Sequence, residues 1–513
     1  MSIGLREWRE ASDTRPSTVG LVLVLGAAAA LRYWSLGHGI PYGVSVDEPE
    51  IVERAFRMMK EGSLDPHFFD YGQLHIYIQL AVSIVRFIAG AITGAWNSLA
   101  EATSDSFYLW GRAVTAAFGV ATVFVVYQIG MRWGARHALL GAALMAVMPL
   151  HVRYSHYVLT DVPLTFFVAL AMLLSLSAHE RPALRAFAFA GAAAGLAAAV
   201  KYNGGMALIM PLVACWMTRS ARPSRLACSL AAIGAAAVAF LVAAPYTVLD
   251  LPGFLDRFAS LTAEYRNAAQ PVQAGEVIYL KHLRLQFGTP GMVLIGVGFV
   301  MGLVRALRGP NQVPWALALA FPIPYFLMIA EQRIIYARYL LPIVPMLCIL
   351  AAVAVISGVS ILRRYQFPRG VRTTLIVLLT MTLLAPPAAT AIQFNRMISA
   401  TSTVDLAYRW IADNIPEGAT IVLEGGHLNL SSTYRDERVP QLRHRTYEDY
   451  LEAGVDYLVA SSQCYGPYFM SPKVYRHEFN DYMVLFSHAQ EVARFTPADD
   501  QPGPELRILK VAP

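Results

Sequence analysis

The stretch Tyr339–Ile356 reads YLLPIVPMLCILAAVAVI and contains no charged residue. A second stretch near the N-terminus, Thr18–Leu31, reads TVGLVLVLGAAAAL. Apolar residues follow one another here without the spacing of a half-buried helix or strand, which is typical of helices that span a bilayer. These stretches predict a membrane protein.

The composition agrees with that prediction. Charged residues make up 15% of the 513 residues, against about 25% in soluble proteins. Mean hydropathy is +0.45, which excludes an ordinary soluble enzyme. The net charge is only +6, and basic clusters interleaved with aromatic residues do not occur, so the sequence does not predict a nucleic-acid partner.

Apolar runs between charged residues predict about 11 transmembrane helices in a polytopic α-helical protein. The predicted spans cover residues 18–36, 108–130, 138–150, 162–178, 185–200, 204–217, 226–245, 290–305, 314–330, 340–358 and 373–392. Loops rich in Lys and Arg stay in the cytoplasm. One face carries 16 such residues in its short loops and the other carries four, so we expect a multi-pass protein of the cell (inner) membrane with a cytoplasmic N-terminus and an extracytoplasmic C-terminus.

The run from Leu74 to Thr93 is apolar and almost long enough to cross the bilayer. If it crossed, every later basic loop would lie outside. We therefore predict a helix along the outer surface. The predicted membrane domain comprises residues 1–395, and its outer loop 37–107 carries such juxtamembrane helices.

Residues 396–513 are richer in charge and alternate between helix and strand patterns, which predicts a small extracytoplasmic α/β domain. We expect helices at 404–414 and 447–453, and strands at 420–424, 457–461 and 506–511.

Polar residues gather at the outer ends of the predicted spans. Asp47 and Glu48 precede Pro49, where acids either cap a helix or act as catalytic groups beside a lipid head group. Asp161 precedes Pro163 in the same way. Two acids on one surface could deprotonate a hydroxyl, hold a divalent cation or orient an acceptor.

Histidines lie near these acids, at positions 67, 75, 151 and 156. They either complete a metal site or form hydrogen bonds at the interface, and their spacing matches no strong ligand pattern. The candidate metal ligands are Asp47, Asp161 and His156.

Lys201 and Arg338 lie among aromatic residues at the outer interface. Such cations either extend toward lipid head groups or neutralise the phosphate of a bound lipid.

The order of these motifs resembles the GT-C glycosyltransferases, specifically the bacterial branch similar to protein O-mannosyltransferases and the lipid A aminoarabinose transferase. The motifs are Asp47-Glu48, the Arg112 helix through Arg132, Met148 to Leu164, Gly195 to Tyr202, Pro245-Tyr246 with Asp250, and Arg338 to Pro342. The family's Pro-Pro-Leu stretch is replaced here by residues Gln73 to Tyr77, without either proline.

The resemblance implies that a sugar passes, with inversion, from a polyprenyl-phosphate carrier to a glycan, lipid or protein acceptor outside the membrane. It implies that Asp47 is the base, that Glu48 orients it, and that Asp161 supports the acceptor or a divalent cation. The remaining substrate-binding candidates are Lys201, Arg112, Arg338, Tyr202 and His75.

Two alternatives remain at this point. A transporter or flippase of lipid-linked sugars would place ionisable groups at mid-bilayer depth, and the predicted spans have few. A ligase or polymerase using a diphosphate-linked glycan fits the long outer loops equally well.

Overall fold

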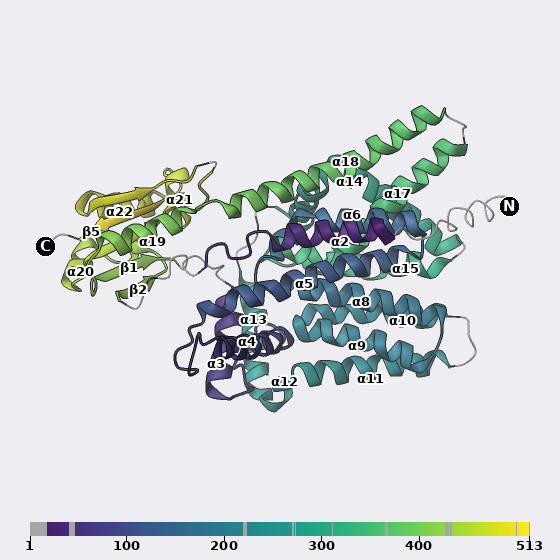
Figure 1. Cartoon of the computed structure of the whole chain (residues 1–513), viewed down its shortest axis with the longest axis horizontal. Coiled ribbons are helices and arrows are strands. Elements are labelled where there is room, and N and C mark those ends of the chain that lie inside the picture. Colours follow the sequence, from purple (N-terminus) through teal and green to yellow (C-terminus); the bar gives the residue numbers. More distant parts are fainter. Residues whose placement is uncertain are drawn as a thin grey trace. The chain divides into compact units, whose positions relative to one another are not determined.

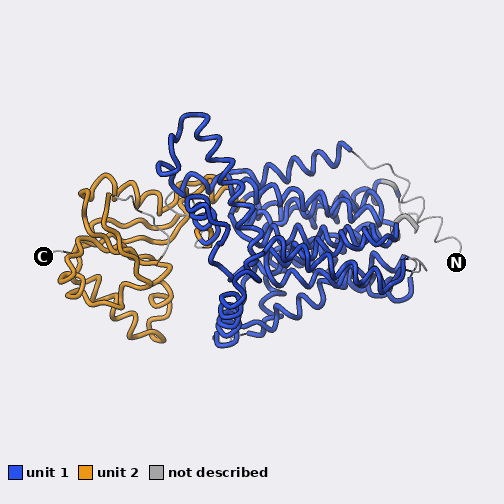
Figure 2. Tube along the Cα trace, turned by 90° about the horizontal axis from the view of Figure 1, so that it is seen from below, with its two compact units in different colours: residues 1–34, 50–392 blue, residues 35–49, 393–513 orange. Residues whose placement is uncertain are grey.

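The structure is a computed structural model that describes residues 18–40, 47–218, 223–268, 271, 273–309, 311–364, 368–425, 430, 433–498 and 500–511. The chain forms two compact units, coloured separately in Figure 2. Met1–Trp34 and Glu50–Ile392 form the first, called the membrane unit here. Ser35–Pro49 and Gln393–Pro513 form the second, called the C-terminal unit.

Apolar helices make up most of the membrane unit (Figure 1). They are α2 (Thr18–Tyr33), α5 (Asp105–Gly130), α6 (Ala135–Val147), α8 (Asp161–Glu180), α9 (Leu184–Val200), α10 (Ile209–Met217), α11 (Arg225–Ala243), α14 (Gly275–Arg308), α15 (Gln312–Ala320), α16 (Pro322–Ala330), α17 (Val344–Arg364) and α18 (Arg369–Ser399), which continues into the C-terminal unit. Among the described residues, eight segments are long and apolar enough to cross a membrane. Every predicted span falls on an apolar helix, and the number that crosses the bilayer stays a prediction.

Several predicted spans are less regular than the sequence indicated. The sixth begins with a 3-10 helix, η1 (Tyr202–Leu208), before α10. The ninth is interrupted at Phe321, and the tenth starts with the 3-10 helix η2 (Ala337–Ile343). The eighth is part of the long α14, which is kinked where Gly288 has a φ of 68° just before Pro290.

Small residues allow α9 and α11 to pack closely. A Cβ atom at Gly191 would lie 2.0 Å from the carbonyl oxygen of Ala232, and one at Gly195 would lie 2.1 Å from that of Ala236. Two glycines four residues apart therefore let the two backbones touch, as small residues commonly do between membrane helices.

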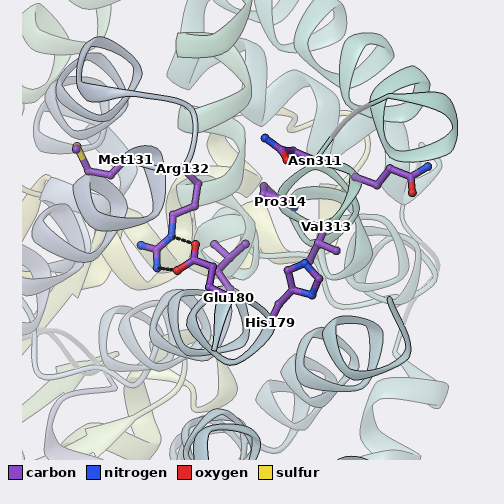
Figure 3. Close-up of a pocket in the computed structure, with 9 residues that line it drawn as sticks. Met131, Arg132, His179, Glu180, Asn311, Val313 and Pro314 are labelled. Carbon is purple, nitrogen blue, oxygen red and sulfur yellow. Dashed lines mark hydrogen bonds and ion pairs between the residues drawn. The ribbon is translucent and has the colours of Figure 1, made fainter. Parts of the chain in front are cut away.

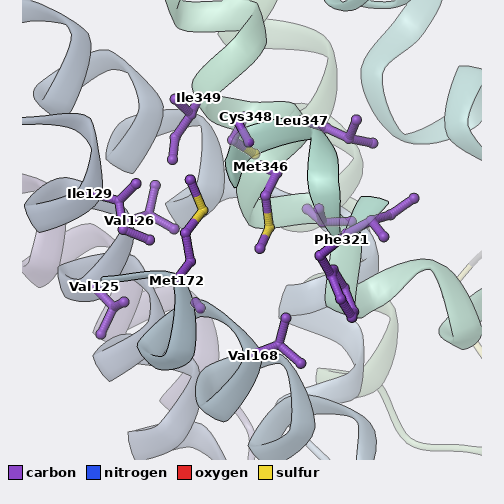
Figure 4. Packing of buried hydrophobic residues seen from close by; sticks show 14 of the residues in the cluster. Val125, Val126, Ile129, Val168, Met172, Phe321, Met346, Leu347, Cys348 and Ile349 are labelled. Atoms are coloured by element: carbon purple, nitrogen blue, oxygen red, sulfur yellow. The ribbon is translucent and has the colours of Figure 1, made fainter. Parts of the chain in front are cut away.

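The centre of the membrane unit is α17. Its apolar segment is 89% buried, whereas that of α18 is 17% buried. Figure 4 shows Met346, Cys348 and Ile349 of α17 packed toward Val126 and Met172 of neighbouring helices.

The bundle has two ends, which we name after the residues found there. At the Asp161 end lie the start of α8, the end of α9 with Lys201, and the start of α5. At the Arg132 end, α5 and α8 finish side by side and Arg132 pairs with Glu180.

Short helices cover the Asp161 end. They are α3 (Pro49–Glu61), α4 (Leu74–Ile92), α7 (Pro149–Tyr154), α12 (Tyr246–Leu249) and α13 (Leu251–Asn267). None of the residues of α13 is fully buried.

Helix α4 is long and apolar enough to cross a membrane, but both of its ends lie at the Asp161 end. At its start, Gln73 Oε1 accepts a hydrogen bond from the Tyr246 backbone N–H over 3.1 Å. Near its finish, the Arg86 guanidinium lies 5.7 Å from the Trp110 ring centroid, close to the start of α5. In Figure 1, α4 is viewed nearly along its axis while α5 and α8 run across the view. This geometry favours the predicted course along the outer surface.

The C-terminal unit is a five-stranded sheet with strand order β2-β1-β3-β5-β4. Strands β1 (Thr420–Glu424), β2 (Arg435–Val439) and β3 (Tyr457–Ser461) are parallel, and β4 (Gln490–Phe495) and β5 (Leu506–Lys510) complete the sheet in antiparallel pairs. Helix α19 (Thr403–Asn414) packs on one face. Helices α20 (Tyr447–Glu452), α21 (Ser462–Met470) and α22 (Arg476–His488) supply the aromatic core of the other.

All five elements predicted for this region exist within a residue or two of their predicted bounds. The sequence did not indicate β2, β4, α21 or α22. Strand β2 reads RDERV and is exposed over four of its five residues, so it has no apolar alternation to detect.

Glu424, at the end of β1, joins three segments of this unit. Its buried carboxylate accepts hydrogen bonds from the backbone N–H groups of Leu442 at 2.8 Å and Ser461 at 2.9 Å, and from the Tyr482 hydroxyl. Burial raises the pKa of Glu424. The stability that this shift contributes is present at acidic pH and is lost as pH rises through the native pKa.

Candidate active site

Asp161 is the best-defined polar centre of the membrane unit. It is the first residue of α8, where a carboxylate is favoured by the positive end of the helix dipole. Its side chain is 4% exposed. Lys201 Nζ lies 3.0 Å from Oδ1, and Arg338 Nε lies 3.7 Å from Oδ2. Three side chains that are distant in sequence therefore meet, and together they carry one net positive charge.

Local backbone structure brings both cations to Asp161. Helix α9 ends at Val200, and Lys201 is extended, with φ −156° and ψ 130°, before the chain enters η1. Arg338 lies in η2, which directly precedes the buried α17. Each cation therefore sits where an apolar helix stops or starts, as the sequence predicted.

Aromatic rings surround the two cations. Lys201 Nζ lies 4.7 Å from the Tyr339 ring centroid and 5.7 Å from that of Tyr71. The Arg338 guanidinium lies 4.6 Å from the Tyr336 ring. These contacts hold each charge by its attraction to a ring face.

Helix α13 contacts this cluster through Tyr265 and the neighbouring loop through Arg257. The Tyr265 and Tyr339 hydroxyl oxygens are 2.6 Å apart, and Arg257 donates two hydrogen bonds to Asp70 in the outer loop. The hydrogen bonds to Asp70 and Glu264 raise the pKa of Arg257, and burial raises the pKa of Tyr265. Both side chains therefore stay protonated and keep their donors.

Tyr202 has a positioning role in the structure. Its hydroxyl lies 3.0 Å from the carbonyl oxygens of both Phe69 and Tyr71. It thereby fixes the backbone of residues 69–71 beside Lys201, and the predicted contact with substrate stays a prediction.

His75 is fully buried in the first turn of α4 and interacts electrostatically with Asp161. Neither ring nitrogen has a hydrogen-bond partner among the described residues. Arg112 is also fully buried, on α5, and the contacts described for it are with Tyr157 and His156. Its role in binding phosphate stays a prediction.

His156 has both ring nitrogens close to backbone carbonyl oxygens. Nδ1 is 2.8 Å from the oxygen of Val152 and Nε2 is 2.9 Å from that of Trp34. This arrangement favours the hydrogen-bonding interpretation for His156. Within the described part of the chain no three His, Cys, Asp or Glu side chains form a group suited to a metal ion, and the divalent cation stays a prediction.

Asp47 and Glu48 belong to the C-terminal unit. They directly precede α3, which begins at Pro49, and Glu48 is fully buried. Their catalytic roles stay predictions.

The sequence did not indicate the role of Arg32. It is fully buried on α2, and its guanidinium donates to the carbonyl oxygens of Met145 and Ala146 at 3.1 and 2.8 Å. These carbonyls belong to the last turn of α6, so Arg32 caps that helix from a neighbouring one. An arginine inside an apolar run is the one signal that could have identified it.

A cavity of about 570 Å³ opens at the Arg132 end. Figure 3 shows Arg132 facing Glu180 on one wall, with His179, Asn311 and Pro314 around it. Because it lies at the far end of the 20-residue α8, it is roughly 30 Å from Asp161. It is therefore separate from the cation cluster.

The fold is that of the GT-C membrane glycosyltransferases. Residues 53–258 match the family described as dolichyl-phosphate-mannose-protein mannosyltransferase. No curated protein matches the chain significantly.

Two solved structures share the fold over nearly the whole chain. ArnT from Cupriavidus metallidurans bound to undecaprenyl phosphate is 15% identical with a TM-score of 0.57, covering 97% of this chain and 99% of that chain. The oligosaccharyltransferase AglB from Archaeoglobus fulgidus, in complex with an inhibitory peptide and a dolichol-phosphate, is 13% identical with a TM-score of 0.58, covering 95% and 74%. The resemblance predicted from the sequence is confirmed.

Proposed function

We propose that this protein is a glycosyltransferase that moves a sugar from a polyprenyl-phosphate carrier to an acceptor outside the membrane. The observation that carries the proposal is the meeting of Lys201 and Arg338 at buried Asp161. Two cations around one acid suit an anion, and a lipid phosphate at the end of a bilayer helix is such an anion. The matched ArnT and AglB structures hold undecaprenyl phosphate and dolichol-phosphate, respectively.

The proposed reaction needs a base and a stabilised leaving group. The acceptor hydroxyl oxygen forms a bond to the anomeric carbon, and its proton passes to the Asp47 carboxylate. The bond from that carbon to the phosphate oxygen breaks, and the electron pair leaves on polyprenyl phosphate. Lys201 and Arg338 neutralise the charge that develops there. Attack opposite the leaving group inverts the anomeric centre.

The remaining assignments follow from this scheme. Glu48 orients Asp47, and Asp161 positions the two cations. In the same proposal, Asp161 also supports the acceptor or a divalent cation. The binding site for the lipid-linked donor also includes Arg112, Tyr202 and His75. The excess of Lys and Arg on one face supports a cytoplasmic N-terminus and a C-terminus outside.

The test is a transfer assay with radiolabelled donors. Wild-type protein in lipid nanodiscs should transfer label from a monophosphate-linked sugar and not from a diphosphate-linked oligosaccharide. The opposite preference would indicate the ligase or polymerase alternative. Movement of the lipid-linked sugar across the membrane without transfer would indicate the flippase alternative.

Asp47→Asn tests the base. We expect turnover to fall by roughly 10² to 10⁴, the range for loss of one general base. As a control, the variant must insert into the membrane and bind undecaprenyl phosphate as the wild type does, so that the two turnover rates can be compared. Transfer at close to the wild-type rate would remove Asp47 from the mechanism.

A further inference from the structure

Three polar groups around the Asp161 cluster are buried without a complete set of hydrogen bonds. His75 is fully buried, and neither of its ring nitrogens has a partner among the described residues. Asn203 donates from Nδ2 to the Tyr325 hydroxyl over 3.1 Å, while its buried Oδ1 has no partner in the described chain. Tyr279 is also fully buried, and its hydroxyl lies near the Tyr336 backbone without a regular hydrogen bond.

These three groups come from three separate elements, and Tyr325 on a fourth element connects them. His75 and Tyr325, on α4 and α16, both interact electrostatically with Asp161. Asn203 follows Lys201 by two residues, in η1. Tyr279, on α14, interacts electrostatically with Tyr325. His75 and Tyr325 therefore lie near the carboxylate that holds the two cations, and Asn203 and Tyr279 lie near Tyr325.

Buried polar groups are normally hydrogen-bonded, because a donor or acceptor that loses water without gaining a partner costs free energy. Other buried polar atoms of this unit also lack partners among the described residues, such as Trp133 Nε1 and His137 Nδ1. His75, Asn203 and Tyr279 differ from them because they lie near the Asp161 cluster. A ligand that supplies both donors and acceptors would satisfy them.

We infer that His75, Asn203 and Tyr279 bind the hydroxyl groups of the sugar on the lipid-linked donor. The inference rests on the proposed function, in which Lys201 and Arg338 bind the adjoining phosphate. A neutral imidazole offers one donor and one acceptor, the Asn203 carbonyl offers an acceptor, and a phenol offers both. Sugar hydroxyls match this set because each can donate and accept. In their neutral forms these three side chains offer hydrogen bonds but no charge. This chemistry fits a hydroxyl-rich, uncharged sugar.

A binding experiment separates recognition of the sugar from recognition of the phosphate. The probes are undecaprenyl phosphate alone and undecaprenyl phosphate carrying mannose, glucose, galactose or arabinose, with affinities measured on the full-length protein in nanodiscs. We expect the wild type to bind at least one sugar-linked lipid more tightly than the bare lipid. Tyr279→Phe and His75→Leu should each reduce that preference by about 2- to 12-fold, the value of one hydrogen bond.

The same variants should leave the affinity for bare undecaprenyl phosphate unchanged. Tyr279→Phe keeps the ring and removes a hydroxyl that forms no regular hydrogen bond with the described residues, so its thermal unfolding temperature should stay close to that of the wild type. Tyr127→Phe is the matched control, since Tyr127 is 5% exposed and lies on α5 toward the Arg132 end. It should change neither affinity.

Three outcomes overturn the inference. The sugar preference could survive both variants, the variants could weaken bare and sugar-linked lipid equally, or the wild type could bind every sugar-linked lipid no more tightly than the bare one. The proposed function would stand in all three cases. Wild-type protein that binds neither kind of lipid would contradict the proposed function itself.

Discussion

Helix α8 has an ion-paired acid at each end, and the two ends differ in burial and in charge. Asp161 is 4% exposed and meets both Lys201 and Arg338. Glu180 is 47% exposed and forms a two-bond pair with Arg132. The cations at the two ends are similarly exposed, so the difference in burial lies in the acids. Asp161, Lys201 and Arg338 sum to one positive charge, whereas the charges of Arg132 and Glu180 balance.

The difference shows why ion pairing by itself is weak evidence for a functional site. An exposed, balanced pair contributes about 0 to 1 kcal/mol and needs nothing further. Asp161 is buried and faces two cations that are 14% and 17% exposed, so charges there are screened less by solvent and an added anion interacts with them more strongly. The Asp161 end is therefore the end at which binding an anion changes the free energy most.

The largest effect that distinguishes the two ends is expected from Asp161→Asn. Removing the buried carboxylate leaves the Lys201 ammonium without its ion-pair partner and costs about 3 to 5 kcal/mol. Thermal unfolding of the purified protein should show this loss, and sugar transfer should fall with it. Glu180→Gln is the matched control at the other end of the same helix. Equal losses from both substitutions would show that the two ends are energetically alike.

Lys201→Gln should have the next largest effect. A hydrogen bond to a charged group contributes about 1.5 to 3 kcal/mol, so the KM for the lipid-linked donor should rise roughly 10- to 100-fold. Turnover at saturating donor should change less, because the lysine binds phosphate already present in the ground state. An unchanged KM would assign Lys201 to an interfacial anchor instead.

The smallest effect is expected from Arg132→Gln. The change in unfolding free energy should be below about 1 kcal/mol and should shrink further at high salt, which screens exposed charges. The donor KM should stay at the wild-type value, since the Arg132 end is far from the proposed phosphate site. A raised KM would link the cavity at that end to catalysis.

Much of the fold follows from local sequence. Continuous apolar runs such as Tyr339–Ile356 must be buried in lipid or protein, so the helices could be located without any knowledge of their neighbours. The same holds for Thr420–Glu424 and Tyr457–Ser461, whose apolar residues mark central strands. The sequence did not predict strand β2, because an exposed edge strand needs no apolar side chains.

The site was only partly accessible to that reasoning. Lys201 and Arg338 stood out because charges are rare beside apolar runs, and Asp161 because it opens a helix. The aromatic partners Tyr71 and Tyr265 did not, since tyrosine is common at membrane interfaces. Their roles depend on which loop crosses which helix end, which is a long-range property of the chain.

The sequence by itself determined the class of protein, the position of its helices and the face that carries the polar groups, because hydropathy and charge act residue by residue. Only the tertiary structure decided that Lys201 and Arg338 share Asp161, that α4 starts and finishes at one end of the bundle, and that His75 and Tyr279 are buried without partners among the described residues. Hydrogen bonds and ion pairs act over a few ångströms, so they exist only after distant segments have been brought together.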